Sequence, residues 1–181
     1  MMASAYSVLM SVYHKEKPEY LRLAIESIQS QTFPTDDFVL VCDGPLNPEL
    51  DAMIAAKQQE METTLNVVRL AKNGGLGNAL NEGIKHCKNE LIARMDSDDI
   101  AYPDRCERQL RIFNRHPEVS ICSGTVEEFT DDVSIVDSRR VVPETNAEIL
   151  KFSKRRNPFN HPCVMYKKSA VEAVGSYQEF H

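Results

Sequence analysis

The chain alternates short apolar runs with helix-type patterns over roughly its first two-thirds, and this alternation constrains the fold more than any other feature. The apolar runs are bounded by turn residues and predict strands at residues 6–12, 38–42, 65–70 and 91–95. Apolar residues at helical spacing predict helices at residues 18–31, 48–62, 78–86 and 103–116. Such an order predicts an α/β fold with a mostly parallel central sheet and helices on both faces.

After about residue 118 the pattern changes to shorter elements. Strands are predicted at 119–123, 125–129, 134–136 and 163–166, with a hairpin turn at 130–132, and helices at 146–154 and 168–174. We expect one domain over residues 1–181, built from a first half of about 1–117 and a second half of about 118–181.

Polar or aromatic residues follow four successive predicted strands directly. They are Tyr13, Asp43, Asn73 and the acidic run Asp96-Ser97-Asp98-Asp99. In open α/β sheets ligands bind beyond the carboxyl ends of the strands. These residues therefore predict a binding site at that edge of the sheet.

The run after the fourth strand places three carboxylates within four residues, Asp96, Asp98 and Asp99. Carboxylates this close repel one another, and a hard divalent cation removes the repulsion. Mg²⁺ and Mn²⁺ prefer oxygen ligands and often bridge to phosphates. The run indicates a metal-assisted site for a phosphorylated ligand, with an acidic turn that caps the next helix as the alternative.

Three further residues have two readings each. Asp43 precedes Gly-Pro, so it is either a turn residue or a carboxylate that accepts a hydrogen bond from a nucleobase. His161 lies in a loop between two prolines, which suits either a solvated histidine or a positioned polar contact. Arg94 is the only charged residue of its predicted strand and needs an anionic partner, either a nearby carboxylate or a substrate.

Composition excludes several classes. A net charge of −6 argues against a general nucleic-acid binder, although short basic clusters occur at 139–140 and 151–156. Five cysteines without a C-x-x-C pair indicate neither a disulfide framework nor a zinc site, so a reducing cytoplasm is the simplest setting. The sequence has no apolar run of membrane-spanning length and no signal-peptide pattern, which leaves peripheral membrane association open.

Taken in order, several segments resemble family-2 inverting glycosyltransferases, which use nucleotide-sugars and have the GT-A fold. The similar segments cover nearly the whole chain, at 7–13 (SVLMSVY), 23–33 (LAIESIQSQTF), 41–44 (VCDG), 73–83 (NGGLGNALNEG), 94–99 (RMDSDD), 103–105 (PDR) and 157–177. The resemblance assigns the first half to the nucleotide-sugar donor and the second half to the acceptor.

The resemblance also implies roles for individual residues. Tyr13 and Asp43 would contact the nucleobase, Asp96 the ribose or diphosphate, and Asp98 the metal ion, Mn²⁺ or Mg²⁺. The full expected set is Val12, Tyr13, Asp43, Asn73, Arg94, Asp96, Ser97 and Asp98 for the donor, Asp98 and Asp96 for the metal, and His161 on the acceptor side.

The implied reaction moves a sugar from a nucleotide-sugar, most simply a UDP-sugar, to a saccharide or lipid-linked acceptor in polysaccharide or glycoconjugate synthesis. The implied location is the cytoplasm or the inner face of its membrane.

One departure from the family pattern concerns the catalytic base. The family places an acidic base in a Glu-Asp motif shortly after the segment that resembles Gly175-Ser-Tyr177, and this sequence has no such motif before His181. We therefore expect a catalytic domain truncated before its base, which lies beyond His181. The alternatives are an inactive fragment that binds nucleotide-sugars and a sugar-nucleotide pyrophosphorylase. The second is disfavoured because no glycine-rich loop follows the first strand.

Overall fold

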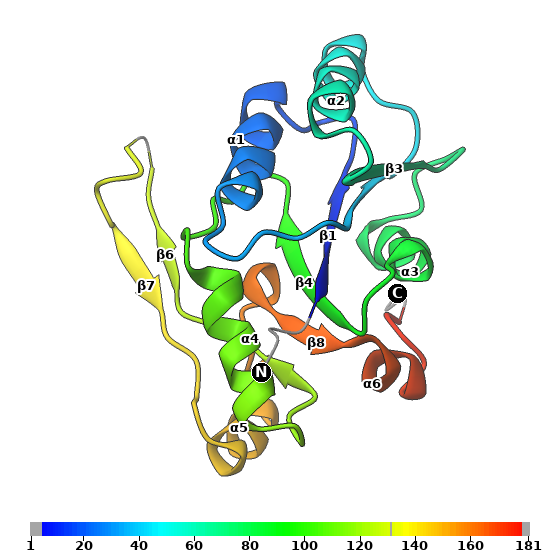
Figure 1. Cartoon of the computed structure of the whole chain (residues 1–181). Coiled ribbons are helices and arrows are strands. Elements are labelled where there is room, and N and C mark those ends of the chain that lie inside the picture. The colour runs from blue at the N-terminus through cyan, green and yellow to red at the C-terminus, as the bar shows by residue number, and fades with distance from the viewer. Residues whose placement is uncertain (1–4, 131, 179–181) are drawn as a thin grey trace.

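The computed structural model describes residues 5–130 and 132–178 and confirms the α/β architecture (Figure 1). One six-stranded sheet has the order β3-β2-β1-β4-β8-β5. Its strands are β1 (Tyr6–Val12), β2 (Phe38–Cys42), β3 (Leu65–Arg69), β4 (Leu91–Asp96), β5 (Ile121–Cys122) and β8 (Met165–Lys167).

Because the first four strands are parallel, the candidate residues lie together at the C-terminal ends of these strands. β1 pairs in parallel with β2 and β4, and β2 pairs in parallel with β3. Val12 lies opposite Cys42, and Ser11 lies opposite Asp96, so β1, β2 and β4 end side by side. β8 runs antiparallel to β4 and β5, which brings the second half of the chain into the same sheet.

Helices cover both faces of the sheet, as predicted. Alternate residues of β1 point to opposite faces, so Val8 and Met10 join one buried cluster and Leu9 joins the other. The first cluster packs under α1 (Pro18–Gln29), α2 (Pro48–Met61) and α4 (Arg105–Arg115), and the second packs under α3 (Leu76–His86), with α6 (Lys168–Ala173) at its margin.

A buried carboxylate lies at the N-terminal ends of the central strands, opposite the end that carries the candidate site. Asp37 has no exposed surface and accepts hydrogen bonds from Ser7 Oγ at 2.5 Å and Lys88 N at 2.8 Å. Ser7 Oγ in turn accepts from Asn89 N at 3.0 Å. These hydrogen bonds connect the N-terminal ends of β1, β2 and β4, so Asp37 has a structural role.

The second half forms a hairpin and short helices at the side of the sheet (Figure 1). The hairpin consists of β6 (Val126–Glu128) and β7 (Ser138–Arg140), and α5 (Asn146–Ser153) and the 3₁₀ helix η1 (His161–Cys163) follow. The prediction of a strand at 134–136 is wrong, because these residues belong to the hairpin loop. There Asp132 accepts from Ser134 N through its side chain at 2.8 Å and from Ile135 N through its carbonyl at 2.9 Å.

Smaller differences affect the ends of elements. α3 begins at Leu76 rather than at residue 78, and α4 begins at Arg105 rather than at residue 103. β8 begins at Met165 because the preceding residues form η1. Among the described residues, no helix has the length and apolar character needed to cross a bilayer.

Candidate functional site

The acidic run forms the expected cluster at the end of β4. One carboxylate oxygen from each of Asp96, Asp98 and Asp99 lies within 4.8 Å of the others. Burial and, secondarily, the negative charges of Asp96 and Asp98 together raise the pKa of Asp99 to about 6. A compact set of carboxylate oxygens is the donor set that Mg²⁺ and Mn²⁺ prefer. Asp99 thus joins the two metal-binding residues expected from the sequence.

A buried arginine lies beneath this cluster. Arg94 is 1% exposed, and its guanidinium forks onto Asp96, with Nη1 at 2.9 Å from Oδ2 and Nη2 bonded to Oδ1. Arg105 holds the same strand end by donating to the Arg94 carbonyl at 2.6 Å. Asp96 is therefore the anionic partner that Arg94 requires. Asp98, which is exposed, forms no ion pair within the described residues, so its carboxylate is free to meet a ligand.

The loop after β1 is tied to the acidic run by one hydrogen bond. Ser97 is buried, and its hydroxyl donates to Glu16 Oε2 at 2.5 Å. Glu16 also accepts from the Lys17 main-chain N at 2.8 Å. Sequence reasoning did not identify Glu16, because nothing local relates it to a serine so far along the chain. Ser97 thus fixes the cluster's position relative to the loop that carries Tyr13.

Asp43 holds the glycine-rich segment that leads into α3. Its two carboxylate oxygens accept from Gly74 N at 2.8 Å and Gly75 N at 3.0 Å, and its carbonyl accepts from Asn73 Nδ2 at 3.2 Å. The next residue, Gly44, has φ +86°, and a Cβ there would lie 2.5 Å from Asn73 N. The structure therefore brings Asp43 and Asn73 together, and glycine is needed at position 44.

The residues at the end of β1 differ in accessibility. The Val12 side chain is 1% exposed in the core, and its carbonyl accepts from Asp43 N at 2.8 Å. Only the main chain of Val12 lies toward the site. Tyr13 is 44% exposed, with its ring edge-on to His14 at 5.7 Å. Its ring is thus available for stacking.

His161 lies beside the buried arginine. Burial and the positive charge of Arg94 lower the pKa of His161 to about 4, so the ring is neutral at pH 7. His161 Nε2 lies 3.3 Å from the Tyr177 hydroxyl. Asn81 anchors Tyr177 through both of its main-chain polar groups, at 2.8 and 2.9 Å. His161, the residue expected on the acceptor side, is therefore near enough to Arg94 to feel its charge, and Tyr177 lies against it. The sequence pointed to the segment containing Tyr177 but not to this contact.

The catalytic base expected beyond His181 lies outside the described residues. The site described above therefore does not include the expected catalytic base.

A family model described as "Glycosyl transferase family 2" matches residues 7–175. The chain belongs to glycosyl transferase family 2. This membership agrees with the resemblance seen in the sequence and favours a transferase over the pyrophosphorylase alternative.

Three bacterial relatives are similar over nearly the whole chain. An uncharacterized glycosyltransferase of Haemophilus influenzae is 44% identical over 96% of this chain. The amylovoran biosynthesis glycosyltransferase AmsE of Erwinia amylovora is 42% identical over 96%. The UDP-Gal:alpha-D-GlcNAc-diphosphoundecaprenol beta-1,3-galactosyltransferase of Escherichia coli is 38% identical over 95%. The family-2 chain spans 64%, 64% and 62% of their respective lengths.

Solved structures confirm the GT-A fold of this family-2 chain. Residues 1–349 of S. aureus TarS, in complex with UDP-GlcNAc, match with a TM-score of 0.72 at 20% identity, covering 97% of this chain and 48% of that one. The mannosyltransferase PcManGT of Pyrobaculum calidifontis, in complex with GDP-Man and Mn²⁺, matches with a TM-score of 0.68 at 15% identity, covering 96% and 47%.

Proposed function

We propose that this chain is the catalytic domain, or the donor-binding part of it, of a metal-dependent glycosyltransferase that uses a nucleotide-sugar. The carboxylate cluster of Asp96, Asp98 and Asp99, within 4.8 Å at the end of β4, is the observation that carries the proposal. Residues 1–117 would serve the donor and residues 118–181 the acceptor within one domain.

The metal ion would be Mn²⁺ or Mg²⁺. Asp98 and Asp99 would hold it, with Asp96 shared between the ion and Arg94. When bound, such an ion neutralises the negative charge that develops on the leaving nucleoside diphosphate. Arg94 and Ser97 would keep the carboxylates in place, since each is buried and hydrogen bonded.

For the donor we propose a UDP-sugar. Each Asp43 oxygen already accepts one main-chain N–H and retains a lone pair for the N–H of a uracil ring. The exposed Tyr13 ring would stack on the base, and the Val12 main chain and Asn73 would line the same end of the sheet. The solved relative TarS was captured with UDP-GlcNAc, which supports this donor class.

For the acceptor we propose a saccharide or lipid-linked saccharide in polysaccharide or glycoconjugate synthesis. The names of the E. coli and Erwinia relatives point to this class. His161 and Tyr177 lie beside Arg94 and would face the acceptor. The five free cysteines suit a reducing cytoplasm, and we place the protein there, at the inner face of the membrane.

Calorimetric titration tests the donor and metal together. UDP, GDP and dTDP are titrated with Mn²⁺ and with EDTA, and we expect UDP to bind tightest and only with the metal. Affinity that is equal in EDTA would contradict a metal role for the carboxylate cluster.

The same titration with variants ranks the carboxylates. Asp98→Ala should weaken Mn²⁺-dependent UDP binding more than Asp99→Ala does, because Asp98 is exposed to a ligand whereas Asp99 is half-buried. Asp36→Ala, which removes an exposed carboxylate away from the cluster, is the control and should bind UDP like the unmodified chain.

A further inference from the structure

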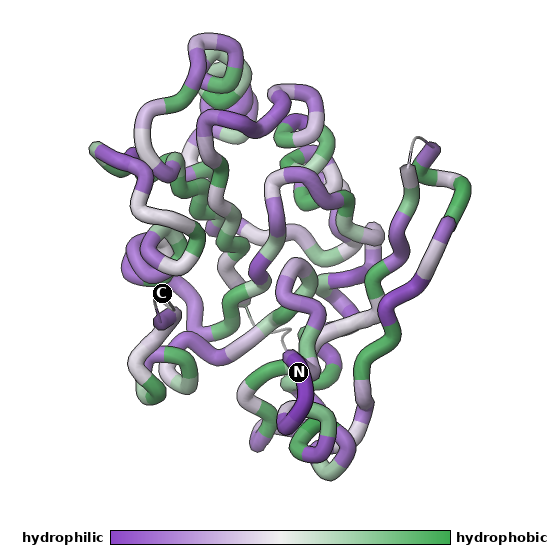
Figure 2. The backbone as a smooth tube through the Cα atoms, turned by 180° about the vertical axis from the view of Figure 1, so that it is seen from behind, coloured by the Kyte–Doolittle hydropathy of each residue, from purple (hydrophilic) through white to green (hydrophobic). Residues whose placement is uncertain are grey.

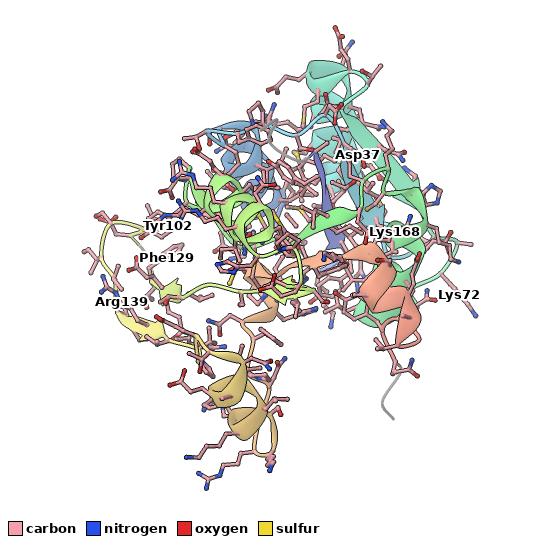
Figure 3. The ribbon with its side chains drawn as sticks, turned by 60° about the horizontal axis from the view of Figure 1, so that its bottom comes forward. Asp37, Lys72, Tyr102, Phe129, Arg139 and Lys168 are labelled. Carbon is pink, nitrogen blue, oxygen red and sulfur yellow. The ribbon has the colours of Figure 1, made fainter. Side chains whose placement is uncertain are left out.

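A cationic and apolar surface lies at the end of the molecule that carries α5. We define the α5 flank as residues 141–156. It holds four exposed cationic side chains within six residues, although the whole chain has a net charge of −6. They are Lys151, Lys154, Arg155 and Arg156. Figure 3 shows α5 projecting away from the sheet with its side chains spread outward.

Two carboxylates lie nearby, and one of them is engaged. Glu148 completes a capping box at the start of α5, where it accepts from Thr145 N at 3.1 Å. Glu144 is exposed. By contrast, the cations of the neighbouring hairpin are paired, Arg139 with Glu127 at 2.8 Å and Arg140 with Glu128 at 2.6 Å. The four cations of the flank form no ion pair with any residue that the structure describes.

Apolar side chains are exposed on the same flank. Val141 is 71% exposed and Leu150 is 58% exposed, and α5 contributes no buried residue to the core. One hollow of about 650 Å³ is lined by Val141, Phe152, Lys151 and Arg155, and the carboxylates of Glu144 and Glu148 line it as well. Figure 2 shows hydrophobic and hydrophilic residues alternating along this end of the chain. Cations and apolar groups therefore share one surface.

We propose that the α5 flank docks this protein on the surface of an anionic lipid bilayer. The cations would meet lipid phosphates, and Val141 and Leu150 would enter the interface between headgroups and acyl chains. Two copies of the flank would repel one another through their like charges, which disfavours self-association. A nucleic-acid backbone would leave the two apolar side chains in water. This proposal names the surface behind the membrane location given above and rests on that part of the proposed function.

Vesicle flotation of the 181-residue chain tests the proposal. The vesicles contain either phosphatidylcholine alone or phosphatidylcholine with one-third phosphatidylglycerol. We expect binding to the anionic vesicles only, and release as salt rises to about 0.5 M, where screening is strong. Absence of binding to the anionic vesicles would overturn the proposal, as would equal binding to both compositions.

Matched variants locate the surface. Each cation near an anionic membrane contributes about fivefold in partitioning, so Lys154→Gln with Arg155→Gln should reduce binding by about 25-fold. Lys72→Gln with Lys85→Gln removes the same charge elsewhere, Lys72 on a side of the molecule away from α5 (Figure 3), and should leave binding nearly unchanged. Equal losses in the two pairs would indicate a general charge effect and overturn the proposal.

The apolar contribution has its own pair of variants. Leu150→Gln should reduce binding by about fivefold to tenfold, whereas Val174→Gln, at a residue 77% exposed outside the flank, should not. Binding of single-stranded RNA in place of vesicles, with the same cation dependence, would reassign the surface and overturn the proposal. UDP titration and thermal unfolding of every variant show whether the donor site and the fold are intact, so a failure of docking is distinguishable from a failure of the proposed function.

Discussion

At the scale of single residues, Asp43 has one role that the structure shows and one that is predicted. Both oxygens accept main-chain N–H groups of the glycine-rich segment, while the side chain is only 5% exposed. The sequence offered a choice between a turn residue and a base-binding residue. The hydrogen bonds show a different role, in which the carboxylate holds the glycine-rich segment 31 residues further along the chain, and the base-binding role remains a prediction.

The substitution Asp43→Asn tests both roles. An amide has only one oxygen, so its NH₂ group would face Gly74 N or Gly75 N, a donor against a donor. We expect the free energy of unfolding to fall by about 1–3 kcal/mol, because a buried N–H loses its partner. UDP affinity should fall as well. Asp36→Asn, an exposed counterpart, should change neither quantity, and unaltered stability of Asp43→Asn in urea unfolding would contradict the clamp.

His161 predicts a pH dependence of stability. The pKa of His161 is about 4 in the folded chain, whereas an unperturbed histidine, as in the unfolded chain, has a pKa of 6.5. Below pH 6.5 the unfolded chain therefore takes up a proton that the folded chain does not. This contribution is fully present above pH 6.5 and is lost as the pH falls toward 4. Allowing for partial solvent screening, the loss is about 1–3 kcal/mol.

The measurement is urea unfolding at pH 7 and pH 4.5 for the unmodified chain and for His161→Gln. The variant lacks the titrating group, so its stability should decline less between the two pH values. Parallel declines would show that the ring is protonated freely in the folded chain.

At the scale of elements, the packing of α3 on the sheet depends on one glycine. A Cβ on Gly83 would lie 2.3 Å from Leu9 Cδ1 and 2.8 Å from Val41 Cγ2, and both partners are fully buried. Gly83→Ala should therefore cost about 1–3 kcal/mol through overpacking. Gly77→Ala in the same helix meets nothing closer than 3.7 Å and should be neutral or stabilising. Thermal unfolding compares the two, and equal melting temperatures would contradict close packing at Gly83.

The predictability of each element follows from its burial. β1, β2 and β4 were predicted from sequence because burial on both faces leaves continuous apolar runs. The hairpin was partly missed because Val133 and Ile135 are apolar yet more than half exposed in its loop. In the candidate site, Asp43, Asn73 and Asp96 are predictable from sequence because each follows a predicted strand or ends one. The bond from Ser97 to Glu16 was invisible, since only the completed sheet brings its two loops together.

At the scale of the whole molecule, stability is distributed unevenly. The central strands lie between two buried clusters, whereas β6 and β7 form a separate two-stranded sheet and α5 buries no residue. Hydrogen exchange read by mass spectrometry should therefore show slow exchange in β1, β2 and β4 and fast exchange in β6, β7 and α5. Uniform protection across these elements would contradict this distribution.

The segment that carries β6, β7 and α5 leaves the sheet and returns to it at a single point. Ser123 Oγ donates to the Asn160 carbonyl at 3.1 Å and accepts from Asn160 N at 3.1 Å, and Asn160 Nδ2 donates to the Gly124 carbonyl at 2.8 Å. Residues 124–160 are thus an excursion closed at its base, and lengthening such a loop costs little free energy. Under the proposed function, a change of length or sequence in this excursion would alter the acceptor-side half and the proposed docking surface and leave the donor residues at the strand ends in place.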